Sequence, residues 1–299
     1  MRELAADVLV IGGGVGGVAA ALGALRQGRR VVMTEESPWL GGQLTSQAVP
    51  PDQNAWIIDI PPTAAYAQWA DGVRNYYRRN FELNDEAAAD ERLNPGGGGV
   101  SGLCHEPRIA VAAFDEMLAP YRSDRQLEVL MEFEPIAAET DGDRVASVTL
   151  QSRRSGDQVV ASAPYVLDAT EEGQLLDLAG VENVYGAESR DDTGELHAVD
   201  GPAQPLNQQS FTWCFALDHQ PGVDHTIARP RDYDYWREYT PGDYWPGKLL
   251  GVADVHPVTL EARERPVFAS DGSWQGERDS SFWHYRRIMT VANYAPGRY

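Results

Sequence analysis

The first 35 residues combine short apolar runs with a helical pattern. Residues 7–11 (DVLVI) form a continuous apolar run, which is typical of a parallel strand buried on both faces. Apolar residues then recur at helical spacing up to Gly28, which predicts a helix ending there. A second apolar run at residues 30–34 (RVVMT) predicts the next strand. The chain therefore opens with a β-α-β unit.

The pattern further along predicts two more helices and another strand. Residues 63–81 and 107–121 carry apolar and aromatic side chains at helical spacing, and Pro107 suits a first helical turn. A glycine-rich loop at residues 94–103 precedes the second of these helices. The apolar run at residues 127–131 (LEVLM) predicts a strand.

A small antiparallel meander is predicted next. Asp-Gly and Ser-Gly turn signals separate three strand-like pieces. These pieces lie near residues 134–139, 144–151 and 157–163. Residues 165–168 (YVLD) then predict a buried strand, followed by a short helix near residues 172–179.

The character of the chain changes after about residue 183. Periodicity weakens, while aromatic residues and prolines become more frequent. This change predicts two domains, at residues 1–182 and 183–299. The first is expected to be an α/β domain, and the second an α+β, aromatic-rich domain.

Charge and composition exclude several classes of partner. Acidic residues outnumber basic ones by 45 to 25, and the net charge is −20. Such a surface repels phosphate backbones and anionic lipids, so neither nucleic acid nor membrane is an expected partner. The short N-terminal apolar run leads directly into glycines, as a strand does and a signal peptide does not. The two cysteines lack CxxC spacing, and a reducing, cytoplasmic setting is expected.

The strongest chemical signal is Gly12-x-Gly14-x-x-Gly17, between the first strand and the first helix. The first glycine permits a tight turn, the second lets the backbone approach a pyrophosphate, and the third allows close helix–strand packing. The free N–H groups of the helix N-terminus favour the negative charge of that pyrophosphate. Glu35 ends the second strand, where a carboxylate accepts hydrogen bonds from ribose hydroxyls and repels a 2′-phosphate. The remaining cofactor contacts expected here are Val15, Gly16 and Glu36.

Three further features favour FAD over NAD. A glycine doublet follows the acid, in Gly41-Gly42-Gln43, and the strands enclose a three-stranded meander. The last predicted strand ends in Asp168-Ala169-Thr170. With these features the sequence resembles the flavoprotein oxidoreductases with a glutathione-reductase-type FAD fold. Among them it is most similar to the FAD-dependent oxidoreductases related to fumarate reductase flavoproteins.

The resemblance implies that residues 1–182 form a three-layer β-β-α FAD/NAD(P)-binding domain and residues 183–299 a substrate domain. It also implies further positions for FAD. In that group the glycine doublet lies beside the pyrophosphate and the flavin, and the Ala-Thr pair closes the dinucleotide site. The contacts added in this way are Gly41, Gly42, Gln43, Ala169 and Thr170. The segments at residues 104–107 (CHEP) and 186–188 (GAE) also resemble the group.

The sequence departs from the group in two places. The usual Ala-Thr-Gly is replaced by Ala169-Thr170-Glu171-Glu172-Gly173, and a carboxylate beside an anionic cofactor is unfavourable unless it points away. The Gly-Asp motif that returns to the flavin in that group has no counterpart, so the C-terminal part of the FAD site is expected to be missing. The pair Gly242-Asp243 lies between prolines outside any strand-to-helix context and is rejected as that motif.

The catalytic candidates are Cys104 and His105, between the glycine-rich loop and the next helix. A helix dipole favours a thiolate there, and an imidazole can transfer a proton. The alternative is a buried, inert cysteine beside a structural histidine. Two roles are also open for Gln43, Thr45 and Ser46: they contact the flavin edge, or they cap their own loop.

Other polar clusters give weaker signals. The histidines in the second half of the chain lack ligand spacing, so no metal is expected. Arg229, Arg231 and Arg237 lie among tyrosines and a tryptophan. They either clamp a substrate carboxylate or stack on aromatic rings at a solvated face.

The sequence therefore predicts an FAD-dependent oxidoreductase that transfers a hydride between a small organic substrate and the flavin. One alternative is a non-catalytic or truncated FAD/ADP-binding fragment, or one part of a split flavoenzyme whose FAD site a second chain completes. Another is a plain NAD-linked dehydrogenase, which needs neither the meander nor Asp168-Ala169-Thr170. The expected partners are the small-molecule substrate and, under the first alternative, that second chain.

Overall fold

The computed structural model describes residues 2–51, 62–242, 245–256, 259–268 and 281–298. Most of the loop that precedes residue 62, and Asp243 of the rejected Gly-Asp pair, lie outside the described residues. The chain divides into two compact units, each discontinuous in sequence. Unit 1 comprises Met1–Val49, Thr63–Val73 and Pro107–Phe215, and unit 2 comprises Pro50–Pro62, Arg74–Glu106 and Ala216–Tyr299.

A parallel sheet forms the centre of unit 1, with its strands in the order β4-β3-β2-β8. The strands are β4 (Leu127–Met131), β3 (Val31–Glu35), β2 (Val8–Ile11) and β8 (Tyr165–Asp168). Every residue of β2 and β3 is buried. This confirms the strands predicted there, since a parallel sheet covered on both faces selects continuous apolar runs. β8 is a strand as predicted but is not buried: it lies at the edge of the sheet, and Tyr165 and Leu167 are 72% and 40% exposed.

A second sheet in unit 1 contains the predicted meander, in the order β1-β7-β6-β5. Its strands are β1 (Arg2–Ala5), β7 (Gln158–Ser162), β6 (Arg144–Ser152) and β5 (Phe133–Asp141). The three meander strands pair antiparallel, whereas β1 joins β7 in parallel. The sequence did not reveal β1 as a separate strand, because this short, exposed edge strand lacks an apolar run.

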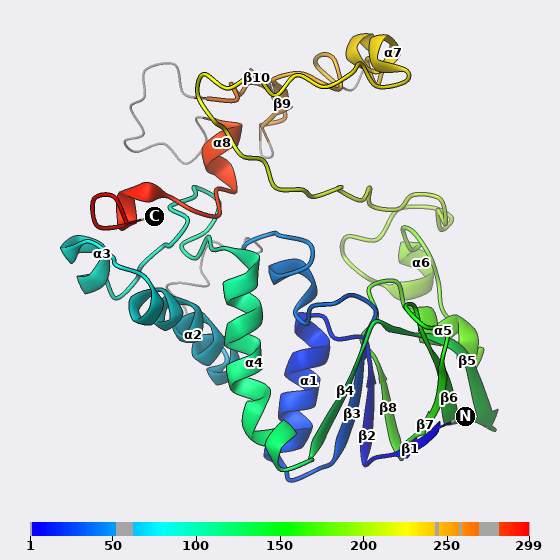
Figure 1. The fold of residues 1–299 in the computed structure, drawn as a ribbon. Helices are drawn as coiled ribbons and strands as arrows, with labels where there is room; N and C mark the ends of the chain where they lie inside the picture. Colours follow the sequence, from blue (N-terminus) through cyan, green and yellow to red (C-terminus); the bar gives the residue numbers. More distant parts are fainter. Residues whose placement is uncertain (1, 52–61, 243–244, 257–258, 269–280, 299) are drawn as a thin grey trace. The chain divides into compact units, whose positions relative to one another are not determined.

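The layers of unit 1 are helix, parallel sheet and meander sheet (Figure 1). Helices α1 (Val15–Arg26) and α4 (Pro107–Ser123) cover one face of the parallel sheet. An apolar core fills the space between the two sheets. Its buried members include Leu9, Ile11, Val32, Val148, Leu150, Val159 and Leu175. The expected three-layer β-β-α architecture is confirmed.

The remaining elements are short, apart from α2 (Ala64–Asn80), which matches the helix predicted at residues 63–81. In unit 1 they are α5 (Gln174–Ala179), α6 (Arg190–Thr193) and the 3-10 turn η1 (Gly42–Leu44). In unit 2 they are α3 (Asp85–Ala89), α7 (Tyr233–Glu238), α8 (Phe282–Tyr285), η3 (Val291–Asn293), β9 (Ala253–Val255) and β10 (Ala262–Glu264).

Unit 2 joins the glycine-rich loop to a segment almost 200 residues later. The Arg287 guanidinium donates to the carbonyls of Gly96 and Gly97, at 2.8 Å each. The Asn293 amide donates to the carbonyls of Asn94 and Pro95, at 3.0 Å each. A Cβ added at Gly96 would lie 2.3 Å from the Arg287 carbonyl oxygen, so the close backbone approach requires glycine there.

The division into units differs from the boundary expected at residue 183. Residues 183–215 group with unit 1 and residues 74–106 with unit 2. The reason is that long-range hydrogen bonds join the loop near Gly96 to the segment at Arg287, and a break in composition does not report such contacts. The assignment of a cofactor domain and a substrate domain stays a prediction.

The aromatic residues of the second half are only partly packed. Phe211, Trp213 and Phe215 are 87%, 81% and 70% exposed. In unit 2 the Arg265 guanidinium lies 5.2 Å from the ring centroid of Phe282 and 4.8 Å from that of Tyr285. Aromatic packing of the expected kind is therefore present around the buried Arg265, but not at residues 211–215.

Candidate functional site

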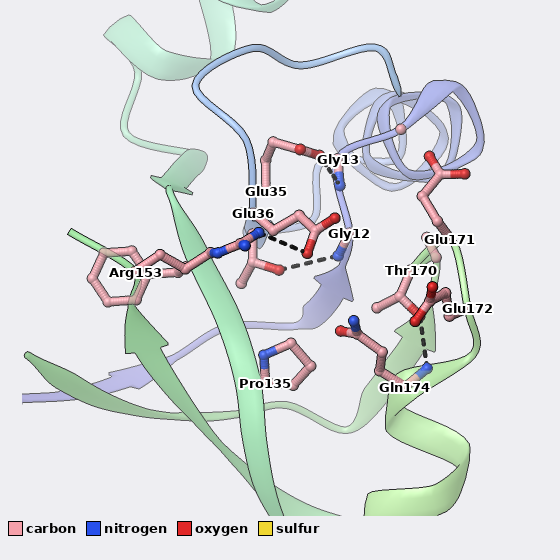
Figure 2. Close-up of a pocket in the computed structure, with 14 residues that line it drawn as sticks. Gly12, Gly13, Glu35, Glu36, Pro135, Arg153, Thr170, Glu171, Glu172 and Gln174 are labelled. Atoms are coloured by element: carbon pink, nitrogen blue, oxygen red, sulfur yellow. Dashed lines mark hydrogen bonds and ion pairs between the residues drawn. The ribbon is translucent and has the colours of Figure 1, made fainter. Parts of the chain in front are cut away.

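A pocket of about 210 Å³ lies at the carboxyl ends of β2, β3 and β8 (Figure 2). In open α/β sheets, ligands bind outside the carboxyl ends of the strands. The lining residues are Gly12, Gly13, Gly14, Thr34, Glu35, Glu36, Phe133, Pro135, Arg153, Ala169, Thr170, Glu171, Glu172 and Gln174. All of them belong to unit 1.

The glycines of the loop after β2 are needed for different structural reasons. Gly12 has a φ of +101°, and a Cβ there would lie 2.2 Å from the Ala169 carbonyl oxygen. A Cβ at Gly17 would lie 2.0 Å from the Gly12 carbonyl oxygen. A Cβ at Gly14 would meet only the Glu171 side chain, at 3.0 Å. Gly12 and Gly17 are thus required by backbone packing, whereas Gly14 keeps space free in the pocket.

The N-terminus of α1 opens beside this loop. Its N-cap is Gly14, which makes no side-chain capping bond, and its first turn carries no acidic residue. The first N–H groups of a helix lack intrahelical partners and attract an anion. Val15 and Gly16, predicted as contacts, lie exposed in this first turn and are not among the residues that line the pocket.

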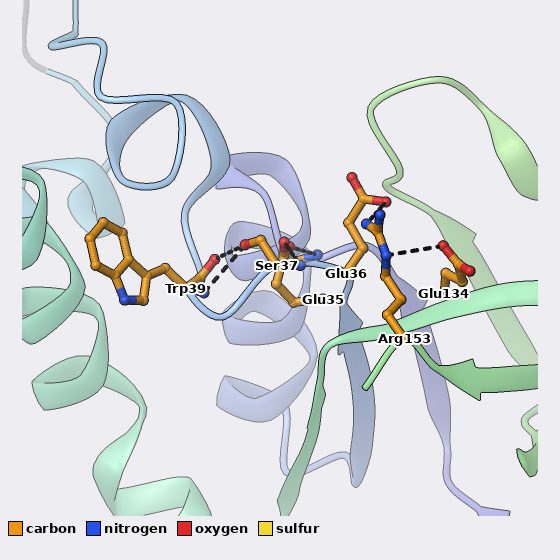
Figure 3. A network of polar contacts seen from close by, with 7 residues as sticks. Glu35, Glu36, Ser37, Trp39, Glu134 and Arg153 are labelled. Carbon is orange, nitrogen blue, oxygen red and sulfur yellow. Dashed lines mark hydrogen bonds and ion pairs between the residues drawn. The ribbon is translucent and has the colours of Figure 1, made fainter. Parts of the chain in front are cut away.

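Glu35 is buried at the end of β3, with 6% of its surface exposed. One carboxylate oxygen accepts a hydrogen bond from the Gly13 N–H at 3.0 Å, and the other from the Ser37 N–H at 2.8 Å (Figure 3). The neighbouring Thr34 hydroxyl oxygen accepts from the Gly12 N–H at 3.0 Å. These bonds hold the glycine loop against β3. Each carboxylate oxygen has a further lone-pair position that can accept from a hydroxyl.

Arg153 follows β6 and extends to the side of the pocket (Figures 2 and 3). Its guanidinium donates to the Glu36 carboxylate at 3.1 Å and lies 3.5 Å from the Glu134 carboxylate. Pro135 on the same side sits at an irregularity in the β5–β6 register. Such bulges often re-aim side chains next to a site. Sequence reasoning missed Arg153, because a turn between two meander strands carries no signal of its distance from the glycine loop.

The predicted glycine doublet packs against the loop after β2. The Gly41 N–H donates to the Gly13 carbonyl at 2.8 Å, and a Cβ at Gly42 would lie 3.2 Å from the Gly14 Cα. Thr45 is fully buried, and its hydroxyl donates to the Leu40 carbonyl at 2.6 Å. For Thr45 the structure thus favours loop capping over contact with a flavin edge.

The turn after β8 is organised by Asp168. Its carboxylate accepts from the Thr170 N–H at 2.9 Å, the Thr170 hydroxyl at 2.7 Å and the Leu175 N–H at 3.0 Å. The Ala169 N–H donates to the Ile11 carbonyl at 2.7 Å. Ala169 and Thr170 therefore line the pocket next to the glycine loop, and their contact with FAD stays a prediction.

The catalytic candidates lie in unit 2 and are not among the residues that line this pocket. Cys104 is fully buried and His105 is 2% exposed. The Cys104 thiol lies 3.6 Å from the Ser101 carbonyl, and Nδ1 of His105 lies 2.8 Å from the Leu103 carbonyl. These local contacts favour a packing role, and a catalytic role for either residue stays a prediction.

A buried phenol bonds to Glu106, the residue that follows His105. The Tyr77 hydroxyl donates to the Glu106 carboxylate at 3.1 Å and accepts from the Glu106 N–H at 3.0 Å. Burial, together with the negative charge of Glu106, raises the pKa of Tyr77 far above its usual value. The phenol thus remains protonated and acts as a structural donor.

The remaining candidates give no further site. Arg229 bonds to the Asp234 carboxylate at 3.1 Å and lies over the Tyr233 ring at 5.2 Å, while Arg231 and Arg237 pair with their sequence neighbours at exposed positions. These contacts favour the solvent-exposed face over a clamp for a substrate carboxylate. Within the described part of the chain, no group of three metal-binding side chains occurs, and no helix has the length and apolarity to cross a membrane.

Comparison with solved structures gives matches at low identity. E. coli quinol fumarate reductase shares 13% identity over 56% of this chain and 33% of that chain, with a TM-score of 0.36. L-Proline dehydrogenase from P. horikoshii shares 18% over 56% of this chain and 23% of that chain, with a TM-score of 0.32. Thermovibrio ammonificans THI4 shares 18% over 62% of this chain and 67% of that chain, with a TM-score of 0.35. This chain spans about a third or less of the first two.

Comparison with family models gives a match over most of the sequence. The model described as FAD dependent oxidoreductase matches residues 7–287. That range includes the glycine loop, Glu35, the doublet and the turn after β8, which the fold brings to one place. The chain therefore belongs to the FAD dependent oxidoreductase family, and FAD is its cofactor.

Proposed function

We propose that the pocket of unit 1 binds the ADP half of FAD and that the protein transfers a hydride between a small organic substrate and the flavin. The observation that carries the proposal is the buried Glu35 carboxylate beside Gly12–Gly14 in one pocket. A buried carboxylate at the end of the second strand suits a ribose with free hydroxyls, and it disfavours a 2′-phosphate.

The residues of the pocket fit the ADP group in a defined order. The uncapped N-terminus of α1 and the space at Gly14 suit the pyrophosphate. Glu35 suits the adenosine ribose, and Ala169-Thr170 close the opposite side. The pocket volume of about 210 Å³ lies below the 300–1,000 Å³ typical of a complete ligand site. It therefore suits part of the dinucleotide.

The adenine is assigned to the side of the pocket formed by Phe133, Pro135 and Arg153. A guanidinium is planar and stacks well on an aromatic base. Two carboxylates, Glu36 and Glu134, hold the Arg153 guanidinium in position. These ion pairs are half exposed and add little stability, so positioning is their main contribution.

Bound FAD supplies the hydride chemistry, and this chain supplies binding and orientation. The Gly41 N–H···O=C bond to Gly13 ties the doublet to the glycine loop, which supports a role for Gly41 and Gly42 beside the cofactor. Gln43 follows the doublet and is proposed as a further cofactor contact. The substrate and the residues that move its proton are proposed to lie outside this pocket.

Competition between ligands tests the proposal. FAD binding to the purified chain is followed by quenching of flavin fluorescence, with ADP or FMN as competitor. ADP is expected to displace FAD and FMN is not, because FMN lacks the adenosine that Glu35 and Arg153 are proposed to hold. Equal competition by ADP and FMN would contradict the assignment. Anaerobic bleaching of the bound flavin by candidate substrates then tests the hydride transfer.

A second candidate is that this chain is one part of a flavoenzyme that another polypeptide completes. Phe211, Trp213, Phe215 and Leu217 alternate along the chain and are 70–87% exposed. Alternating exposed apolar side chains are typical of a strand face that another element covers. Sedimentation of the purified chain, and the fluorescence of a hydrophobic dye added to it, test this candidate. A monomer that does not raise the fluorescence of the dye would argue against it.

A further inference from the structure

Glu171 lies where the phosphate of the cofactor is proposed to bind, and this inference rests on the proposed function. A Cβ added at Gly14 would lie 3.0 Å from one Glu171 carboxylate oxygen, and a Cβ at Gly42 would lie 2.8 Å from the same oxygen. One carboxylate oxygen therefore occupies the space between the two glycine segments. Figure 2 shows this side chain directed toward the start of α1.

The surroundings of this oxygen are those that a phosphate oxygen would require. The hypothetical Cβ at Gly42 is also 3.9 Å from the Val15 nitrogen, so the carboxylate lies near the first turn of α1. That turn has no acidic residue and no side-chain cap of its own. A carboxylate at such a position is stabilised by the helix dipole, as a phosphate would be.

From the sequence, a carboxylate at Glu171 is expected to be unfavourable for cofactor binding unless it points away from the cofactor. In the structure it points toward the glycines, while the adjacent Glu172 approaches neither. We propose that Glu171 is an affinity-determining residue of the FAD site, which competes with the pyrophosphate of the cofactor for the N-terminus of α1. The exposed side chain can turn out into solvent, so the competition weakens binding without preventing it.

Two effects of opposite sign follow from this arrangement. Removing the charge of Glu171 removes repulsion of the pyrophosphate, which raises the affinity for ADP. The same change removes a favourable carboxylate from the N-terminus of α1, which lowers the stability of the ligand-free chain. A residue with only a packing role would change stability without raising affinity.

The test uses Glu171→Gln with Glu182→Gln as the matched control, since each removes one charge and Glu182 is exposed outside the pocket lining. Calorimetry of the full chain is expected to give about five- to tenfold tighter ADP binding for Glu171→Gln, the scale of one charge pair at a solvated distance. Glu182→Gln is expected to change the affinity less than twofold. Adenosine, which has no phosphate, is expected to bind all three proteins alike.

Further readouts separate this inference from the proposed function. The gain for Glu171→Gln is expected to shrink at high salt, because salt screens the repulsion. The ligand-free variant is expected to melt about 1–3 °C lower than the wild type. Wild type and Glu171→Gln binding ADP equally, or an equal gain for adenosine, would overturn the inference and leave the site intact. Folded wild type and variant that both fail to bind ADP would overturn the proposed function and this inference together.

Discussion

Replacing Gly14 with valine is the sharpest perturbation of the proposed site. The backbone of Gly14 has a φ of −61° and a ψ of −175°, which valine also adopts. The new Cβ meets only the end of the flexible Glu171 side chain, at 3.0 Å. We therefore expect Gly14→Val to fold, with a stability loss of about 1 kcal/mol for the poorer N-cap.

Binding is expected to suffer far more than folding. The valine side chain would occupy the space through which a pyrophosphate approaches the N–H groups of α1. Losing two charge-assisted hydrogen bonds costs about 3–6 kcal/mol, which corresponds to at least a hundredfold loss of affinity. Calorimetry with ADP and with FAD measures this loss, and thermal unfolding of the same samples measures stability.

Two glycines of α1 provide the controls for this experiment. A Cβ at Gly23 meets nothing within 4 Å, so Gly23→Val is expected to leave both folding and ADP affinity nearly unchanged. A Cβ at Gly17 would lie 2.0 Å from the Gly12 carbonyl, so Gly17→Ala is expected to prevent folding. A folded Gly14→Val that binds ADP within threefold of the wild type would refute the placement of the pyrophosphate.

Three further predictions concern single residues. Glu35→Ala is expected to weaken ADP binding by about 1.5–3 kcal/mol and to leave any FMN binding unchanged, because FMN lacks the adenosine ribose; equal losses for the two ligands in calorimetry would contradict the ribose contact. Arg153→Ala is expected to weaken adenosine binding about fivefold, whereas Arg154→Ala, at an exposed position outside the pocket lining, is expected to have no effect; equal effects of both would remove Arg153 from the adenine side. Burial, together with the charge of Arg287, lowers the pKa of His284, so the unfolded chain binds the proton more readily than the folded chain. The free energy of unfolding is therefore expected to fall as the pH drops from about 6.5 through the folded-state pKa. Denaturant unfolding from pH 7.5 to 5.5 measures this fall, which should be smaller in His284→Gln.

Local patterns in the sequence were sufficient for the central strands and the meander strands of unit 1. The buried runs at β2 and β3 have no polar alternation, and the Asp-Gly and Ser-Gly turns separate the meander strands. Each of these signals lies within a few residues, and each has one structural solution. The glycine spacing after β2 and Glu35 at the end of β3 belong to the same class, since the β-α-β unit fixes their relative positions.

Contacts between distant segments were decided only by tertiary structure. The pairing of β1 with β7, the approach of Arg153 to Glu36 and the join between Gly96 and Arg287 each link residues more than 100 positions apart. No periodicity records such contacts, because a turn or an edge strand acquires its partner only when the whole chain folds. The grouping of the chain into two discontinuous units has the same origin.

The direction of one side chain was the other feature that the sequence left undetermined. The sequence showed that Glu171 replaces the glycine of the usual turn, and that a carboxylate beside an anionic cofactor is unfavourable. In the structure the Glu171 carboxylate lies beside Gly14 and Gly42, which are more than 100 positions earlier in the sequence. The sequence by itself therefore determined the kind of cofactor site, whereas the tertiary structure decided which charges face it, because side-chain direction follows from contacts that close only in the folded chain.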